Sequence, residues 1–168
     1  MADQPTHRSG VVPVSHHQFF LLDEDVYPED GGRLVWPNGL ATAAPGLLAI
    51  YTGIHLGPVD LRLELHDTPP EPELGRWEDV VELAVEAPTG ALCAGALMED
   101  VPDTLLDPIT HEPGTYRARV HAHGRDTAVD LATHEPVEHY LIQLWPDTNT
   151  AEHTHKITST YGRTNAAT

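Results

Sequence analysis

The sequence predicts an all-β protein, an antiparallel β-sandwich of about seven or eight short strands with flexible N- and C-terminal ends. Fifteen prolines and thirteen glycines interrupt the 168-residue chain too often for long helices. Several segments alternate apolar and polar residues with a period of two, and none keeps a helical period. Turn signals separate these segments by about 8–14 residues, the spacing typical of a sandwich or barrel.

The first half of the chain supplies four expected strands. Residues 11–22 are rich in β-branched and aromatic side chains, and Pro13 near their start indicates an edge or a bulge. An acidic loop follows, and residues 33–37 are expected to form a short strand. Residues 46–53 are an apolar run between glycines, which predicts a buried strand. Residues 59–66 alternate most clearly, so one face is expected in the core and the other in water.

The second half supplies the remaining strands. Residues 77–87 contain helix formers but alternate like a strand, and a strand is favoured because the run ends in Pro-Thr-Gly. Residues 91–98 are expected to be a strand or loop, and residues 101–106 a single helical turn. Residues 114–123 alternate again, and residues 136–145 form the last expected strand. The side chains expected to face water on the strand 114–123 are Arg117, Arg119, His121 and His123.

The length fits one domain, with a disordered lead at residues 1–10, a β-sandwich domain at 11–146 and a flexible tail at 147–168. A core of ~130 residues is large enough to fold without disulfides or metals. The single cysteine, Cys93, cannot form an intrachain disulfide. The first residues do not resemble a signal peptide, and no segment approaches the ~20 apolar residues of a membrane span. A cytoplasmic location is therefore expected.

The net charge of −17, from 26 acidic against 9 basic residues, argues against two kinds of binding partner. Direct binding to nucleic acid or anionic lipid needs a cationic surface, so neither is expected. The acidity is also concentrated, with twelve acids between residues 60 and 103 and a second cluster at 23–30. Such an uneven field favours rapid, salt-sensitive capture of a basic partner, although it also serves solubility alone.

The twelve histidines raise the question of a metal site. His121 and His123 lie on one face of the same expected strand, at a spacing that can chelate a transition metal, as in a cupin-like barrel enzyme. The glutamate that a cupin places shortly afterwards is missing here, and arginines surround the pair. A solvated strand face is therefore favoured over a metal site. His16 and His17 are expected on opposite faces of a strand, where one is bonded to the backbone.

No catalytic motif is evident, so an enzyme is not expected and no cofactor is predicted. The chain lacks a Gly-x-Ser-x-Gly elbow, a phosphate-binding glycine loop and a His-Glu-x-x-His motif. The apolar neighbours of Cys93 predict an unreactive thiol. A small-ligand-binding sandwich module remains an alternative, but it requires Trp36, Trp77 and Trp145 to be exposed.

The acidic segments have a more specific interpretation. Carboxylates at strand spacing on an outward face imitate a row of phosphates, and a basic nuclease or toxin that docks there loses access to nucleic acid. An ordinary solvated face is the alternative. The predicted partner-binding residues are Asp23, Glu24, Asp25, Glu64, Asp67, Glu71, Glu73, Glu78, Asp79 and Glu82.

Two patches resemble the competence protein J family, the inhibitors of the DNA-entry nuclease. Residues 14–21, VSHHQFFL, are similar to the family's first strand, and residues 114–120 with 138–145 to its paired C-terminal strands. The resemblance implies a β-sandwich-like domain that inhibits a nuclease by direct binding. This chain departs from the family in its length, in the proline-rich acidic stretch 68–78 and in the tail after Trp145. An immunity protein against another toxin is therefore a related possibility.

Overall fold

The computed structural model describes residues 4–24, 26 and 34–166. This part of the chain is nearly all β, with ten strands and two short helices. The strands are β1 (Thr6–Ser15), β2 (Gln18–Leu22), β3 (Ala41–Ala44), β4 (Leu47–Tyr51), β5 (Leu56–Leu65), β6 (Asp79–Ala87), β7 (Cys93–Gly95), β8 (Gly114–His123), β9 (His139–Pro146) and β10 (His153–Ile157). The helices are α1 (Asp103–Leu106) and α2 (Thr160–Asn165).

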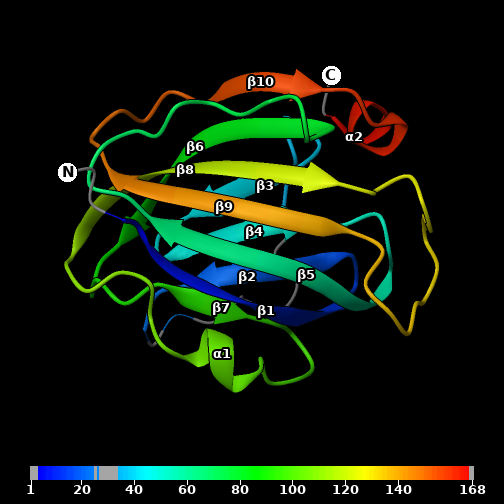
Figure 1. The fold of residues 1–168 in the computed structure, drawn as a ribbon, viewed down its shortest axis with the longest axis horizontal. Helices are drawn as coiled ribbons and strands as arrows, with labels where there is room; N and C mark the ends of the chain where they lie inside the picture. Colours follow the sequence, from blue (N-terminus) through cyan, green and yellow to red (C-terminus); the bar gives the residue numbers. More distant parts are fainter. Residues whose placement is uncertain (1–3, 25, 27–33, 167–168) are drawn as a thin grey trace.

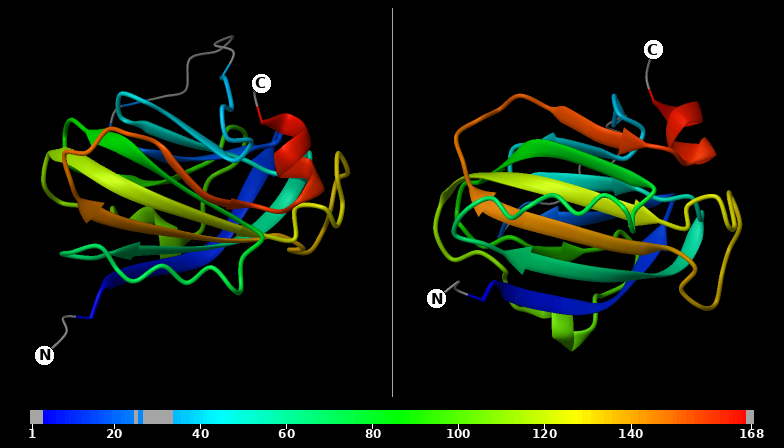
Figure 2. Two further views of the ribbon diagram at one scale, coloured as in Figure 1. Left: turned by 90° about the horizontal axis from the view of Figure 1, so that it is seen from above. Right: turned by 45° about the horizontal axis from the view of Figure 1, so that its top comes forward.

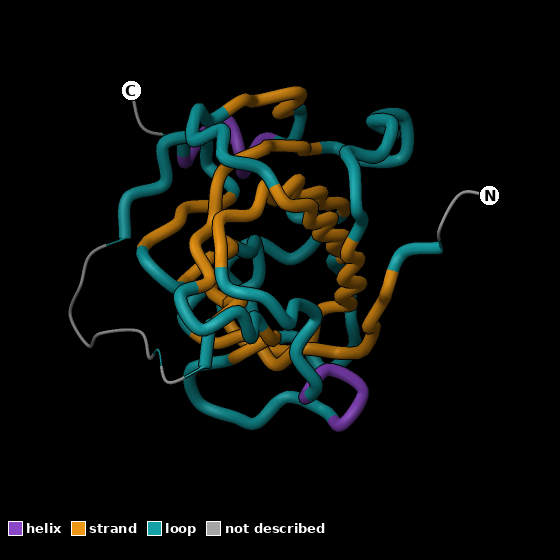
Figure 3. The backbone as a smooth tube through the Cα atoms, turned by 90° about the vertical axis from the view of Figure 1, so that its left-hand side faces the viewer, coloured by secondary structure: helices purple, strands orange, loops and turns teal. Residues whose placement is uncertain are grey.

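All ten strands belong to one sheet that curls into a half-barrel (Figures 1 and 3). Their order is β10-β6-β8-β9-β5-β1-β2-β4-β3, and β7 pairs with β2. The curl brings β3 and β4 against β6, so the far ends of the sheet approach one another. Alternate side chains of these strands fill the interior, among them Phe19, Leu63 and Ile142. This single core accounts for the period-two pattern of the sequence.

The expected antiparallel sandwich is wrong in two respects. The sheet is one continuous layer and not two, and β5 pairs with β9 in parallel, from Asp60↔His139 to Leu65↔Leu144. An alternating strand shows that one of its faces is buried, but the same pattern arises in a sandwich and in a curled sheet. The strands β6, β7 and β8 separate β5 from β9 in the chain, so no local sequence pattern reports that these two strands pair.

The ends of the chain differ from the prediction as well. β1 begins at Thr6, within the segment expected to be disordered. The expected strand 11–22 is divided by a turn at His16 and His17, whose φ angles are 53° and 63°. The expected flexible tail contains β10, which pairs with β6 at one edge of the sheet, and the helix α2, which follows β10 (Figure 2). Of the expected strand 33–37, residue 33 lies outside the described part and residues 34–37 are not a strand.

The strands expected at 46–53, 59–66, 77–87, 114–123 and 136–145 are present as β4, β5, β6, β8 and β9. The expected helical turn is α1, and β7 lies within residues 91–98. The strand β3 was not expected, because its sequence ATAA carries no alternation. Within the described residues, no helix is long and apolar enough to cross a membrane.

Candidate functional site

The outer face of the sheet is crossed by the acidic crossing loop, defined here as residues 66–78 between β5 and β6 (Figure 2). Two hydrogen bonds fix the middle of this loop to strands of the sheet. Arg119 Nη1 of β8 donates to the carbonyl oxygen of Pro70 over 2.9 Å, and Lys156 Nζ of β10 donates to that of Leu74 over 3.1 Å. The loop is therefore fastened to the sheet and does not hang free.

Beneath the loop lies a buried charged layer on β6 and β8. Arg117 and Arg119 are each 3% exposed, and both donate to the carboxylate of Glu82, over 3.2 Å and 2.7 Å. His155 lies 2.7 Å from the same carboxylate. Burial alone raises the pKa of Glu82, but the hydrogen bonds from Arg119, His155 and Arg117 outweigh it and hold the pKa at about 2. Glu82 is thus an ionised structural residue.

The expectation that Arg117, Arg119 and His121 face water is wrong for a reason that lies outside β8. Their strand alternates as predicted, but other segments cover this face. The crossing loop contacts Arg119 and His121, and Arg117 donates to the carbonyl oxygen of Asn149 in the segment that leads to β10. The ring of Trp77, at the end of the loop, lies 5.3 Å from the ring of His121, which is 1% exposed. The alternation of β8 shows which side chains share a face, but it does not show that another segment covers that face.

Four of the predicted partner-binding carboxylates are bound within the protein. Asp23 accepts hydrogen bonds from Thr89 and Ala91, and is 2% exposed. Glu64 pairs with Arg62 at 2.8 Å; its burial raises the pKa, but Arg62, His66 and Gln143 lower it to about 2. The four internally paired carboxylates are Asp23, Glu64, Asp79 and Glu82.

The remaining predicted carboxylates are distributed unevenly. Asp67, Glu71 and Glu73 are exposed, and all three lie on the acidic crossing loop. Glu78, at the end of this loop, has a 35% exposed side chain but is also engaged within the protein. It accepts a hydrogen bond from the backbone N–H of Gly124 over 2.7 Å and lies 3.4 Å from Nδ1 of His123. Glu24 is exposed near the end of β2, away from the loop in sequence, and Asp25 lies outside the described residues. Among the predicted residues that the structure describes, the outward carboxylates are therefore Glu24 and the three acids of the loop, and their part in partner binding stays a prediction.

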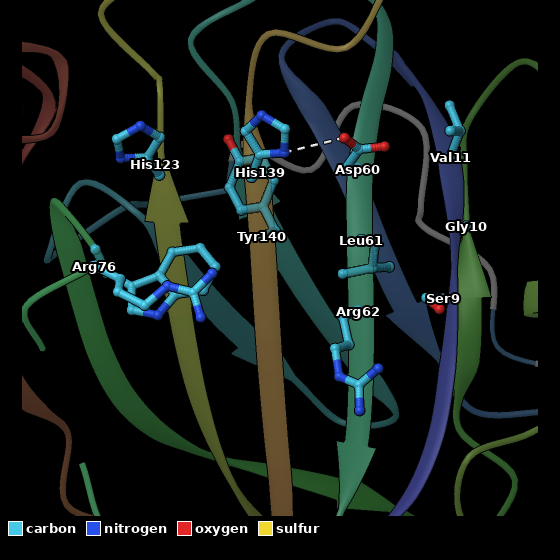
Figure 4. Close-up of a pocket in the computed structure, with 11 residues that line it drawn as sticks. Ser9, Gly10, Val11, Asp60, Leu61, Arg62, Arg76, His123, His139 and Tyr140 are labelled. Carbon is cyan, nitrogen blue, oxygen red and sulfur yellow. Dashed lines mark ion pairs between the residues drawn. The ribbon is translucent and has the colours of Figure 1, made fainter. Parts of the chain in front are cut away.

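A groove of about 630 Å³ opens beside the end of this loop (Figure 4). Its walls come from β1, β5, β8 and β9 and from Arg76 and Trp77 of the loop. His139 Nδ1 and Asp60 Oδ2, on the parallel strands β9 and β5, form an ion pair at 3.0 Å on the groove wall. The groove therefore combines arginine, histidine and carboxylate groups next to the acidic crossing loop.

His121 and His123, the alternative metal ligands, differ in environment. No group of three or more His, Cys, Asp or Glu residues in the described chain is placed to hold a metal ion. Nδ1 of His121 lies 2.9 Å from the carbonyl oxygen of Leu141, whereas the side chain of His123 is 54% exposed. The small-ligand alternative also loses support, since Trp145 is 2% exposed.

We expect His121 to make folding pH-dependent. Burial lowers the pKa of His121 from its ordinary 6.5 to about 4, and the hydrogen bond to Leu141 only partly opposes this. The unfolded chain therefore takes up this proton first, and stability is lost as pH falls from 6.5 towards 4. His121→Asn, which keeps a donor for Leu141, should show a smaller drop in unfolding free energy between pH 7 and pH 5.

Urea unfolding at both pH values measures this difference, and His123→Asn on the same strand is the control. The account is contradicted if His121→Asn and the wild-type chain lose the same free energy over this interval.

Several organising residues were missed by the sequence analysis. Arg125 is fully buried, and its guanidinium bonds Asp79 and the carbonyl oxygens of Gly39 and Tyr51. Glu138 is also fully buried, and accepts hydrogen bonds from the backbone of Gly53 and Ile54. Nothing in the sequence around either residue signals this burial, because the partners lie 46 to 86 residues away.

The fold places the chain in a class of small proteins built on one curled, mixed β-sheet. Among solved structures of this class, ComJ from Bacillus subtilis, described as an inhibitor of the DNA degrading activity of NucA, matches 88% of this chain and 99% of its own, with a TM-score of 0.56 and 14% identity. The protein described as crocagin biosynthetic gene J matches 86% and 99%, with a TM-score of 0.55 and 16% identity.

No family model and no curated protein matches the chain. The likeness to ComJ confirms the resemblance drawn from the sequence at the level of the fold.

Proposed function

We propose that this chain is an acidic binding protein that inhibits a basic nuclease or toxin by direct contact. The observation that carries the proposal is the acidic crossing loop, which presents Asp67, Glu71 and Glu73 to solvent from a backbone fixed to β8 and β10. The fold adds support, since ComJ, with which the chain shares it, is described as the inhibitor of a nuclease's DNA degrading activity.

The fixed backbone distinguishes this loop from acids that merely aid solubility. A mobile acidic segment loses conformational entropy when it binds a partner. A loop that is already fixed to the sheet loses little, because its backbone became ordered on folding. Its carboxylates then oppose the cationic surface with which a nuclease holds DNA, so association is accelerated and weakens with salt.

The distribution of the basic residues supports the same proposal. Arg117, Arg119 and Arg125 are buried and engaged with Glu82 or Asp79. Three buried acids, Asp23, Asp79 and Glu138, balance these arginines, so burial leaves the excess of acids over bases at the surface unchanged. A basic partner therefore meets the full acidic excess of the composition, with few bases among the surface acids.

The test is a DNA degradation assay at low and at high salt with NucA, the nuclease that ComJ is described as inhibiting. In parallel, the purified chain serves as bait in a lysate of its own organism at both salt concentrations. We expect inhibition of NucA or capture of a nuclease or toxin at low salt, with loss at high salt. The proposal is overturned if NucA is not inhibited and no nuclease or toxin is retained in either condition.

A further inference from the structure

The turn between β1 and β2 has an unfavourable backbone conformation for its residues. His16 and His17 have φ angles of 53° and 63°, where asparagine and glycine are usual in a two-residue hairpin turn. Asp130 is the third non-glycine residue with a positive φ in the described chain, at 62°. Its Oδ1 lies 3.2 Å from Nε2 of His17. All three such residues therefore meet at one end of the sheet, a concentration that marks candidate functional sites.

Aromatic rings surround this turn. The ring of His17 is stacked with that of Tyr161, at 6.1 Å and 11°, and lies 5.6 Å from that of Tyr51. Tyr51 is itself stacked with Trp36, at 4.7 Å and 10°. Trp36, Tyr51 and His17 are half-buried, and His55 beside them is exposed. This ring cluster, comprising His17, Trp36, Tyr51 and Tyr161, thus keeps part of its aromatic surface open to solvent.

Buried charged side chains hold the ring cluster in place from the interior of the protein. Arg125 lies 5.3 Å from the ring centre of Tyr161 and donates to the carbonyl oxygen of Tyr51. Asp79, paired with Arg125 at 2.9 Å, also accepts hydrogen bonds from Ser159 at the start of α2. Glu138 fixes the loop that follows Tyr51. The rings are therefore preorganised and need little rearrangement to bind a ligand.

The rim of the ring cluster is acidic. Asp130 has a 73% exposed side chain, and Asp126 accepts hydrogen bonds from the backbone of Thr160 and Tyr161. Glu152 contacts Asn38, two residues after Trp36. Arg163 on α2 is also exposed. Carboxylates beside partly exposed aromatic rings are an environment that attracts a guanidinium group, through ion pairing and cation–π contact.

We propose that the ring cluster and Asp130 form a binding site for an arginine side chain of a basic protein partner. This inference rests on the proposed function, which supplies the basic partner, and adds the place where that partner is held. The exposed side chains of Leu56 and Leu131, at 48% and 59%, border the turn and suit the aliphatic part of arginine.

The test does not need the natural partner. N-acetyl-L-arginine methylamide is titrated into the isotope-labelled chain, and ring signals are followed by NMR. The neutral isostere N-acetyl-L-citrulline methylamide is the ligand control. We expect saturable shifts of the His17, Trp36 and Tyr51 rings with arginine and much smaller ones with citrulline. The proposal is overturned if neither compound shifts these rings or if both shift them equally.

The variant Asp130→Asn removes the charge but keeps a residue that tolerates positive φ and can still bond His17. It should weaken arginine binding about threefold or more, as expected for loss of one exposed charge pair. Glu86→Gln, an exposed residue at the far end of β6, is the matched control and should have no effect.

An unchanged affinity in Asp130→Asn contradicts the proposed site. Inhibition of NucA by the wild-type chain is scored separately. If NucA is not inhibited, no nuclease or toxin is retained from the lysate and arginine still binds, the proposed function is rejected and the arginine site is retained.

Discussion

Replacing Arg125 with methionine should lower the free energy of unfolding by about 3–5 kcal/mol, the usual cost of removing one partner of a buried ion pair. Both Arg125 and Asp79 are fully buried, so the substitution leaves the Asp79 carboxylate without its counter-charge, with only the hydrogen bonds from Thr158 and Ser159. It also removes the donor that serves the carbonyl oxygens of Gly39 and Tyr51. Urea unfolding followed by tryptophan fluorescence measures the loss.

The control is Arg62→Met, because the Arg62 side chain is 45% exposed and its pair with Glu64 is near the surface. That change should cost about 0–1 kcal/mol. Equal losses in the two variants would show that the Arg125–Asp79 pair does not have the central structural role assigned to it.

The second large effect concerns the acidic crossing loop. Neutralising it with Asp67→Asn, Glu71→Gln and Glu73→Gln should slow association with the nuclease about tenfold at low salt, because electrostatic steering is lost. Stability should change by less than about 0.5 kcal/mol, since all three side chains are exposed. Stopped-flow association kinetics give the rate constants.

A charge-matched control is provided by Glu86→Gln, Glu99→Gln and Glu112→Gln, three exposed acids outside the loop. The control carries the same change in net charge, so it separates the local field from the overall charge. If both triple variants slow association by the same factor, the loop has no special part in capture and only the net charge acts.

The sequence predicts individual strands well, because burial of one face leaves a period of two. Val59, Leu61 and Leu63 of β5 are buried as their alternation indicates. The same pattern does not say how strands join, so the single curled sheet and the parallel β5–β9 pair were not predicted. The short strand β3 and the terminal elements β10 and α2 carry too little apolar pattern to be recognised.

The candidate site is harder to predict from the sequence than the fold is. Glu71 and Glu82 are both acids in one segment, yet one faces solvent and the other binds two buried arginines. What separates them is the path of the crossing loop over β8, a long-range feature. The ring cluster was missed for a related reason, since His17, Tyr51, Asp130 and Tyr161 meet only in the folded chain.

The most direct test of the central claim is competition between this chain and DNA for the nuclease. Labelled, non-cleavable duplex DNA is bound to NucA, or to the nuclease retained from lysate, and fluorescence anisotropy is followed as the chain is added. The account predicts complete displacement by the wild-type chain, and about tenfold more of the loop-neutralised variant for the same effect. DNA that stays bound at saturating concentrations of the chain would contradict the account.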